Sequence, residues 1–164
     1  MIFVTAGTTP FQFVRLERLV IRLSDLYPGK KILFQIRNLT KSDFASSVMV
    51  KDSLSQDRFT DVIKKAEIIV THAGFATIMQ ILQNAKTKPL VMPRLKKYNE
   101  HVNDHQLYFV RFMEKKGLVS LVRNSRNIKN LIDKNVYDRG LVEKYLREVN
   151  IRKRKLVSYL NSLT

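Results

Sequence analysis

The sequence predicts an α/β protein, a parallel sheet flanked by helices and followed by a helical C-terminal extension. Short apolar runs typical of strands alternate with longer segments whose apolar residues recur at helical spacing. Strands that alternate with helices form β-α-β units, and these units build parallel sheets. The run at residues 68–71 is apolar up to its last residue, as expected for a strand buried on both faces of such a sheet.

The elements follow one another in a simple order over one domain, residues 1–164, with an α/β core at 1–122 and a helical extension at 123–164. Pro28-Gly29, Pro93 and Gly117 each end an element. The predicted strands are residues 2–5, 32–36, 48–50, 68–71, 89–92 and 118–122. The predicted helices are residues 11–26, 57–66, 75–85, 100–116 and two within 125–163 that are broken near 138–140.

The composition excludes several classes of protein and indicates an anionic partner. The chain has no cysteine, which excludes a disulfide scaffold, a thiol nucleophile and a cysteine-ligated zinc or iron–sulfur site. Its 30 Lys and Arg against 14 Asp and Glu give a net charge of +16, which predicts binding to nucleic acid, phosphates or an anionic membrane surface. The basic run at residues 152–155 is either a solvated helix face or a contact for lipid headgroups or an acidic partner.

We expect neither a signal peptide nor a membrane-spanning segment. The chain starts with an apolar run and lacks the basic segment that opens a signal peptide. The longest uncharged stretch, residues 68–85, is interrupted by polar side chains such as Thr71, His72 and Gln80. A bilayer span is therefore not predicted there.

The first candidate site is the loop after the first predicted strand. Parallel sheets bind ligands at the carboxyl ends of their strands, in the loops that lead into helices. Gly7 allows backbone N–H groups to approach a ligand closely, and the Thr8 hydroxyl adds a donor. A tight turn in which Thr8 or Thr9 caps the helix explains the same residues. The loop is neither a GxGxxG fingerprint nor a Walker A motif.

The second candidate site is the turn at residues 72–74 and the start of the helix that follows. Small residues there leave the first N–H groups of the helix free, and these groups and the helix dipole favour a diphosphate. The alternative is an ordinary strand–helix turn with a hydrogen-bonded His72. The candidate ligand contacts in this stretch are His72, Ala73, Gly74, Ala76, Thr77 and Gln80.

The third candidate site, residues 93–106, has the densest polar content of the chain. His101 and His105 are four residues apart and share a helix face if the helix starts by Glu100. Such a pair can bind zinc, but no Glu directly follows His101, so we expect no metal site. Alternatively, polar side chains here bond the hydroxyls of a ligand, and a phosphate relieves the repulsion among the cations. The candidate contacts are Arg94, His101, Asp104, His105 and Gln106.

Together, these stretches resemble the C-terminal domain of family 28 glycosyltransferases. The similarity spans roughly residues 2–120 and includes the small single-domain members that are catalytic subunits of two-part transferases, acting on lipid-linked oligosaccharide or in bacterial exopolysaccharide and capsule synthesis. The matching motifs are Val4-Thr5-Ala6-Gly7-Thr8-Thr9-Pro10-Phe11, Thr71-His72-Ala73-Gly74 with Thr77-Ile78-Met79, Pro93-Arg94, and Glu100-His101-Val102-Asn103-Asp104-His105-Gln106.

The resemblance implies a Rossmann-like half of a GT-B enzyme that binds a UDP-sugar as substrate, with no cofactor and no metal. By this analogy, residues 74–77 hold the diphosphate, and position 80 bonds the ribose hydroxyls. The residues implied to face the sugar or to shape the pocket wall are Arg94, His101, Asp104, His105 and Gln106. Two positions depart from the family pattern: Ala76 stands where glycine is frequent, and Gln80 replaces the usual Glu.

The resemblance also implies partners. Larger members carry an N-terminal domain that binds the acceptor, so we expect a separate, membrane-anchored subunit to supply that half. The C-terminal helix is a plausible docking element, although most of its apolar residues are expected to cover the sheet of this domain. The acceptor is then a lipid-diphosphate-linked sugar, and the chain is cytoplasmic and peripheral to an anionic membrane. The catalytic base is expected on the partner, with His72 or His105 as alternatives.

Three rival functions remain open. A nucleic-acid-binding module explains the charge, but the sequence lacks a helix-turn-helix, a zinc finger and an aromatic RNP-type strand, so no nucleic acid is expected. A non-catalytic accessory subunit explains the change at Gln80. The third rival is a nucleotide-dependent Rossmann enzyme of another type, but the sequence lacks the dinucleotide fingerprint of such enzymes.

Overall fold

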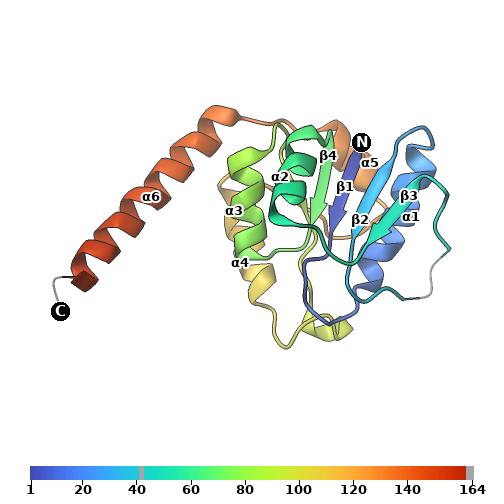
Figure 1. Cartoon of the computed structure of the whole chain (residues 1–164), viewed down its shortest axis with the longest axis horizontal. Coiled ribbons are helices and arrows are strands. Elements are labelled where there is room, and N and C mark those ends of the chain that lie inside the picture. The colour runs from blue at the N-terminus through green and yellow to red at the C-terminus, as the bar shows by residue number, and fades with distance from the viewer. Residues whose placement is uncertain (41–42, 162–164) are drawn as a thin grey trace.

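The computed structural model describes residues 1–40 and 43–161, and the strands of this part form one six-stranded sheet (Figure 1). All neighbouring strands pair in parallel, in the order β3-β2-β1-β4-β5-β6. Helices flank the sheet, so the predicted α/β fold with a Rossmann-like parallel sheet is confirmed. The strands are β1 Ile2–Thr5, β2 Ile32–Gln35, β3 Val48–Lys51, β4 Ile68–Thr71, β5 Leu90–Val91 and β6 Ser120–Leu121.

Two helices begin later than predicted, and both delays lengthen a loop at the carboxyl edge of the sheet. Helix α1 begins at Val14 because Phe13 is its N-cap residue and has a non-helical backbone. Helix α4 begins at His105 because a 3-10 turn and the left-handed Asn99, with φ of 55°, precede it. The helices are α1 Val14–Leu26, α2 Gln56–Lys65, α3 Phe75–Asn84, η1 Lys96–Tyr98, α4 His105–Lys115, α5 Ile128–Asp133 and α6 Arg139–Asn161.

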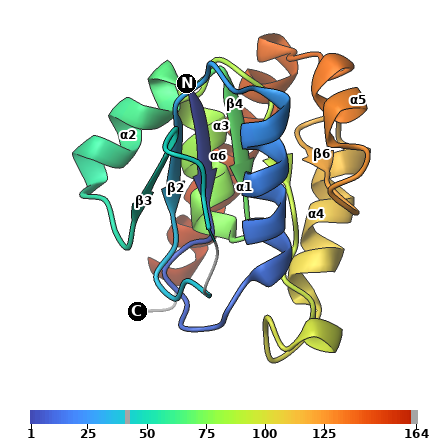
Figure 2. The same ribbon diagram turned by 90° about the vertical axis from the view of Figure 1, so that its right-hand side faces the viewer.

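Apolar side chains on both faces of the sheet form the core. On one face, Val4 and Phe34 pack against α1 and α5. On the other face, Phe3 and Ile69 pack against α2 and α3. Figure 2 shows α1 and α2 on opposite sides of the strands. A third cluster joins α3, α4 and the start of α6 beside β5 and β6, so the sheet is covered on both faces. The loops that the sequence predicts to bind a ligand lie at its carboxyl edge.

Helix α6 leaves the body of the molecule after its first turns (Figure 1). Val142 is buried, and Tyr145 and Leu146 pack against the cluster of α3 and α4. Leu156 and Val157 are exposed, so the expectation that most apolar residues of this helix cover the sheet is wrong for its far half. The predicted helix end at residue 163 lies outside the described residues. Within the part of the chain that the structure describes, no helix has both the length and the apolar character needed to cross a bilayer.

Candidate functional site

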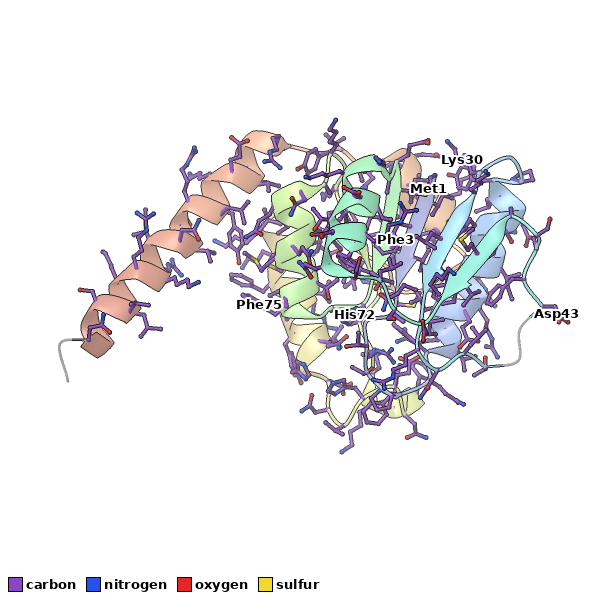
Figure 3. All side chains as sticks on the ribbon, viewed as in Figure 1. Met1, Phe3, Lys30, Asp43, His72 and Phe75 are labelled. Atoms are coloured by element: carbon purple, nitrogen blue, oxygen red, sulfur yellow. The ribbon has the colours of Figure 1, made fainter. Side chains whose placement is uncertain are left out.

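The strand order brings two of the predicted loops together. The order reverses between β1 and β4, and open parallel sheets bind ligands in the crevice beyond the strand ends at such a point. The loop after β1 contains Gly7 and Thr8, and the loop after β4 contains His72 and Gly74. Figure 3 shows His72 beyond the end of β4, with Phe75 at the start of α3. The candidate site therefore lies at this reversal point.

The His72 imidazole is packed between two glycines. The residue is 6% exposed, and its backbone N–H donates to the Thr5 carbonyl over 3.0 Å. A Cβ atom on Gly7 would lie 2.5 Å from His72 Cε1, and one on Gly74 would lie 2.2 Å from Nε2. Gly7 also has a φ of 73°, which disfavours any side chain. Both glycines are therefore required by the imidazole as well as by the tight turns.

Burial keeps His72 neutral. Loss of solvation and, to a smaller extent, the positive charge of Arg94 lower the pKa of the imidazole to about 4, even though the Thr5 backbone opposes the shift in part. The Nδ1 atom is buried, and no atom of the described residues hydrogen-bonds to it. A neutral imidazole has one donor and one acceptor nitrogen, so the ring can hydrogen-bond a ligand through whichever nitrogen faces the cleft.

A cleft of about 230 Å³ opens beside His72. Its walls come from the loop after β1, the residues after β3 and the first turns of α3. The lining residues are Thr5, Gly7, Thr8, Thr9, Gln35, Ser53, Leu54, Gln56, Phe59, His72, Thr77 and Gln80. The cleft thus brings together the predicted contacts of the first loop with three of those from the second stretch.

The N-terminus of α3 opens beside this cleft without a cap. Gly74 is the N-cap residue, no side chain caps the helix, and the first turn has no acidic residue. Among the described residues, no acceptor bonds the N–H groups of Phe75, Ala76 or Thr77. Free N–H groups and the positive end of the helix dipole attract anions. Since Thr77 is the residue of this turn that lines the cleft, an anion bound to the turn would lie at the edge of the cleft.

A hydrogen bond to a residue of α2 fixes the side chain of Gln80 in the cleft wall. Its Nε2 donates to Thr60 Oγ1 over 3.2 Å, and the Thr60 hydroxyl donates to the Gln56 carbonyl over 2.9 Å. These bonds fix the amide plane and engage only its nitrogen. The side-chain oxygen of Gln80, Oε1, is therefore available as an acceptor for a ligand hydroxyl.

Arg94 is buried within the protein, which differs from its expected place on the pocket wall. It is 0% exposed, and its guanidinium donates to the carbonyls of Ala6, Phe11 and Gln12. The guanidinium carbon also lies 4.4 Å from the centroid of the Phe13 ring. Burial lowers the pKa of Arg94 to about 10, so the group stays charged at neutral pH. Arg94 therefore holds the loop after β1 and can act on a ligand only through that loop.

Gln106 has a similar positioning role, which also differs from the expected contact with a sugar. Its side chain is buried, and Oε1 accepts hydrogen bonds from the N–H groups of Ala73, at 3.2 Å, and Arg94, at 3.1 Å. One amide oxygen thus ties the turn after β4 to the residues after β5. Ala73 is itself buried, so it contributes to the site through this turn.

Glu100 completes this scaffold, and the sequence analysis did not select it. The carboxylate is 3% exposed and accepts hydrogen bonds from Arg15 Nε, at 2.9 Å, and from the Leu95 N–H, at 3.1 Å. The Arg15 guanidinium also lies 4.7 Å from the centroid of the Tyr98 ring. Arg15 and Glu100 are 85 residues apart, so no local pattern in the sequence reveals their pairing.

None of His101, Asp104 and His105 lines the cleft. They lie just before and at the start of α4, where the centroid of the His101 ring is 5.8 Å from that of Phe11 in the loop after β1, and we call this place the rim. His101 is not part of α4, so the predicted shared helix face is wrong, but the two imidazoles still meet edge to face with 4.7 Å between centroids. Burial lowers the pKa of His101, and the charge of His105 lowers it further. Asp104 Oδ1 accepts the Lys96 N–H over 2.8 Å, and His105 is exposed beside Asn103.

Two polar residues beneath the cleft were also missed from the sequence. The Thr5 hydroxyl donates to Gln35 Oε1 and accepts the Gly7 N–H over 3.2 Å, and Gln35 Nε2 donates to the Asp52 carbonyl over 3.3 Å. A polar residue at the carboxyl end of an otherwise apolar strand is the signal that could have identified both. Among the described residues, no group of three or more His, Asp and Glu is arranged to hold a metal ion.

A comparison with known families extends these observations. The model of the glycosyltransferase family 28 C-terminal domain matches residues 1–150. This range includes the whole sheet, the cleft, the rim and the first turns of α6. No curated protein sequence matches the chain.

Proposed function

The chain belongs to the glycosyltransferase family 28 C-terminal domain family, and from this premise we propose that it is the donor half of an inverting transferase that uses a UDP-sugar. Family membership makes it a donor-binding domain of a glycosyltransferase. Beyond family membership, we propose the identity of the nucleotide, the class of the acceptor and the kind of partner. The observation that carries it is the uncapped N-terminus of α3, whose Thr77 lines the same cleft as the neutral His72.

A nucleoside diphosphate suits this end of α3 by its charge. The N–H groups of Phe75, Ala76 and Thr77 and the helix dipole would offset the negative charge, and the Thr77 hydroxyl would add a donor. Neutral His72 would add one hydrogen bond. The diphosphate would thus be bound mainly by backbone groups that the fold already holds in place.

We assign the nucleoside to the rest of the cleft. Gln80 lies one helical turn beyond Thr77 in the cleft wall, where its free carbonyl oxygen would accept a hydrogen bond from a ribose hydroxyl. The part of the cleft lined by Ser53 and Gln56 would then receive the uracil. A neutral amide at position 80 gives a weaker bond to the ribose than the carboxylate that is usual there.

The proposed reaction is attack by an acceptor hydroxyl on the anomeric carbon, with departure of UDP. The charge that develops on the leaving diphosphate would be stabilised by the N-terminus of α3. His72, with a pKa of about 4, is a poor general base at neutral pH. We therefore assign the base to the acceptor-binding half, with His105 at the rim as the alternative within this chain. His101 and Asp104, also at the rim, would contact the donor sugar.

We further propose that a separate, membrane-anchored subunit supplies the acceptor-binding half. The described strands form one Rossmann-like sheet, and a GT-B enzyme encloses its substrates between two such domains, so this donor half needs a complementary acceptor-binding half. The proposed acceptor is a lipid-diphosphate-linked sugar of polysaccharide or glycan synthesis, so the complex would act at the cytoplasmic face of a membrane. The net charge of +16 supports a location beside anionic lipid.

Ligand-observed saturation-transfer NMR tests the donor assignment. The purified chain is mixed with UDP, UDP-GlcNAc, UDP-galactose, UDP-glucuronate and GDP, and we expect selective signals from one UDP-sugar. Thr77→Val should weaken binding by about fivefold or more, because one hydrogen bond to a charged group is lost. Thr87→Val, beyond the other end of α3, is the matched control and should bind as the wild type does.

The outcomes separate the proposed roles. His105→Ala should reduce signals from the sugar protons and leave those of the uridine unchanged. Binding without turnover in the presence of the co-expressed partner would assign the chain as an accessory subunit. The absence of any UDP-sugar signal, with the partner and without it, would contradict the proposed donor.

A further inference from the structure

One face of α6 is apolar along its whole length, although it is buried at the start of the helix and solvent-exposed towards the end. Val142, Val149 and Leu156 follow one another at two-turn spacing and so lie on the same face of the helix. Val142 is 2% exposed, Val149 is half-buried, and Leu156 is 57% exposed. The stripe that packs against α3 and α4 at the start of the helix therefore continues beyond the body of the molecule (Figure 1).

The open half of α6 is basic around this stripe. The segment from Asn150 to Asn161 contains four basic residues and no acidic one. Arg152, Lys153, Arg154 and Lys155 are all exposed, and within the described part of the chain none forms an ion pair. Because successive helical residues are turned by about 100°, these cations surround the helix, and Arg152 and Lys153 flank the apolar stripe.

The neighbouring face of α4 has a related composition. Tyr108 and Phe112, one turn apart, are 69% and 50% exposed. The Lys116 ammonium lies 5.8 Å from the centroid of the Phe112 ring. Phe112 and Lys116 also form, with Val149 and Arg152, a groove of about 330 Å³ between α4 and α6. Aromatic, aliphatic and basic side chains of the two helices thus meet in this groove, where Glu148 is the one acidic residue of the lining. We define the α4–α6 surface by Tyr108, Phe112, Lys116, Val149, Arg152, Lys153, Arg154, Lys155, Leu156 and Val157.

We propose that the α4–α6 surface binds an anionic lipid bilayer directly. A helix with an apolar stripe and a basic remainder lies in the membrane interface with its stripe toward the acyl chains. Long basic side chains at the edges of the stripe reach the headgroups while their stems cover apolar area, and Tyr and Phe suit the same interface. Cations on every side of the helix, with no acidic residue among them, match a continuous layer of negative headgroups.

This contact is distinct from the donor cleft and does not depend on the proposed sugar nucleotide. No residue of the α4–α6 surface lines the cleft beside His72. The chain itself would therefore bind the membrane, in addition to any anchor that a partner subunit provides. Failure of lipid binding would leave the donor assignment unaffected, and failure of UDP-sugar binding would leave this inference unaffected.

A tryptophan reporter tests insertion of the stripe, because the chain has no Trp of its own. Leu156→Trp is mixed with vesicles of phosphatidylcholine alone and with vesicles that also contain phosphatidylglycerol. We expect a blue shift of the emission, and quenching by brominated acyl chains, only with the anionic vesicles. Arg58→Trp, exposed on α2, is the control and should show neither. An unshifted spectrum of Leu156→Trp with anionic vesicles would overturn the proposal.

A pair of charge variants tests the electrostatic contribution by vesicle co-sedimentation. Changing Arg152, Lys153, Arg154 and Lys155 to Gln should lower the partition coefficient for anionic vesicles by about tenfold or more. The control removes the same charge from exposed residues of α1 and α2, by changing Arg18, Arg22, Lys64 and Lys65 to Gln. It should lower the partition coefficient by less than about threefold, because these residues are not part of the α4–α6 surface and salt weakens the attraction of charges that do not contact the headgroups. Equal losses in both variants would overturn the assignment to α6.

Discussion

The loops after β4 and after β5 both border the candidate site, but their polar groups do different things. After β5, the side chains of Arg94, Glu100 and Gln106 are buried and bonded to other parts of the protein, and the unbonded Arg94 Nε and His101 Nδ1 are buried as well. After β4, the first N–H groups of α3 have no partner among the described residues and stand at an uncapped helix end. The loop with more charged residues is the scaffold, and the loop with fewer is open to a ligand.

The difference follows from the free energy of burying polar groups. A buried charge is tolerated only when hydrogen bonds or an opposite charge compensate its lost solvation, so a dense polar stretch in the interior bonds to itself and to nearby backbone. Glycine and alanine cannot cap a helix by their side chains, so they leave backbone donors unbonded. Unbonded groups, rather than the number of polar residues, therefore indicate where a ligand can bind.

Replacing Arg94 should have the greatest effect on stability. Arg94→Met removes the hydrogen bonds to the Ala6, Phe11 and Gln12 carbonyls, and we expect the free energy of unfolding to fall by about 3–5 kcal/mol. Urea denaturation measures this, and Thr77→Val in the open loop should stay within about 1 kcal/mol of the wild type. An Arg94→Met protein that is fully stable but no longer binds UDP would show that Arg94 is a ligand contact.

Filling the space at Gly74 should be the next most severe change. Gly74→Ala places a methyl group 2.2 Å from His72 Nε2, and we expect a loss of about 1–3 kcal/mol in stability. In the His72→Ala background, the same substitution should cost much less, because the imidazole is gone. Denaturation of the two single variants and the double variant measures this coupling.

Gly7 is the matched control for that cycle. Gly7→Ala meets the same imidazole, at 2.5 Å, but its φ of 73° adds backbone strain that His72→Ala cannot relieve. If His72→Ala restores the stability of Gly74→Ala but only part of the stability of Gly7→Ala, the packing of the imidazole between the two glycines is confirmed. Equal behaviour at both positions would contradict it.

The buried imidazole should also make stability depend on pH. The pKa of His72 is about 4 in the folded protein against an ordinary value of 6.5, so the unfolded chain binds the proton more readily and acid favours unfolding. The stability that neutral His72 contributes is fully present above pH 6.5 and is lost as the pH falls toward 4. Between pH 7 and about pH 4.5, the wild type should lose about 2 kcal/mol more stability than His72→Gln. Parallel losses in the two proteins would exclude a neutral buried His72.

Gln80→Glu should produce the mildest change, and in the opposite direction. A carboxylate bonds a ribose hydroxyl more strongly than an amide does, so UDP should bind up to about tenfold more tightly, with stability nearly unchanged. A UDP titration followed by NMR or calorimetry measures the affinity. Unchanged binding would show that the ribose does not lie at position 80.

The fold was largely predictable because its signals are local. The apolar runs of β1 and β4 and the helical spacing of α1 and α3 identified the α/β class and placed the loops at one edge of the sheet. The start of α4 was missed because the left-handed Asn99 and the 3-10 turn before it leave no clear pattern in a stretch of polar residues. The course of α6 was missed because its apolar spacing is the same where it is covered and where it is not.

The site was only partly predictable, because long-range contacts decide which polar groups remain free. Gly7, Thr77 and Gln80 could be selected from their positions after predicted strands, and they do line one cleft. Arg94 and Gln106 follow strands in the same way, yet tertiary contacts with the loops after β1 and β4 engage the two terminal guanidinium nitrogens of Arg94 and the amide oxygen of Gln106. Nothing in the local sequence distinguishes these two outcomes.

The most direct test of the donor site follows the backbone amides of the chain by ¹H–¹⁵N NMR during a titration with UDP, with uridine as the comparison ligand. The account predicts that UDP shifts the amide signals of Phe75, Ala76 and Thr77 most strongly, and that uridine, which lacks the diphosphate, leaves them nearly unchanged. Shifts confined to the basic half of α6, or equal shifts with both ligands, would contradict a diphosphate site at the N-terminus of α3.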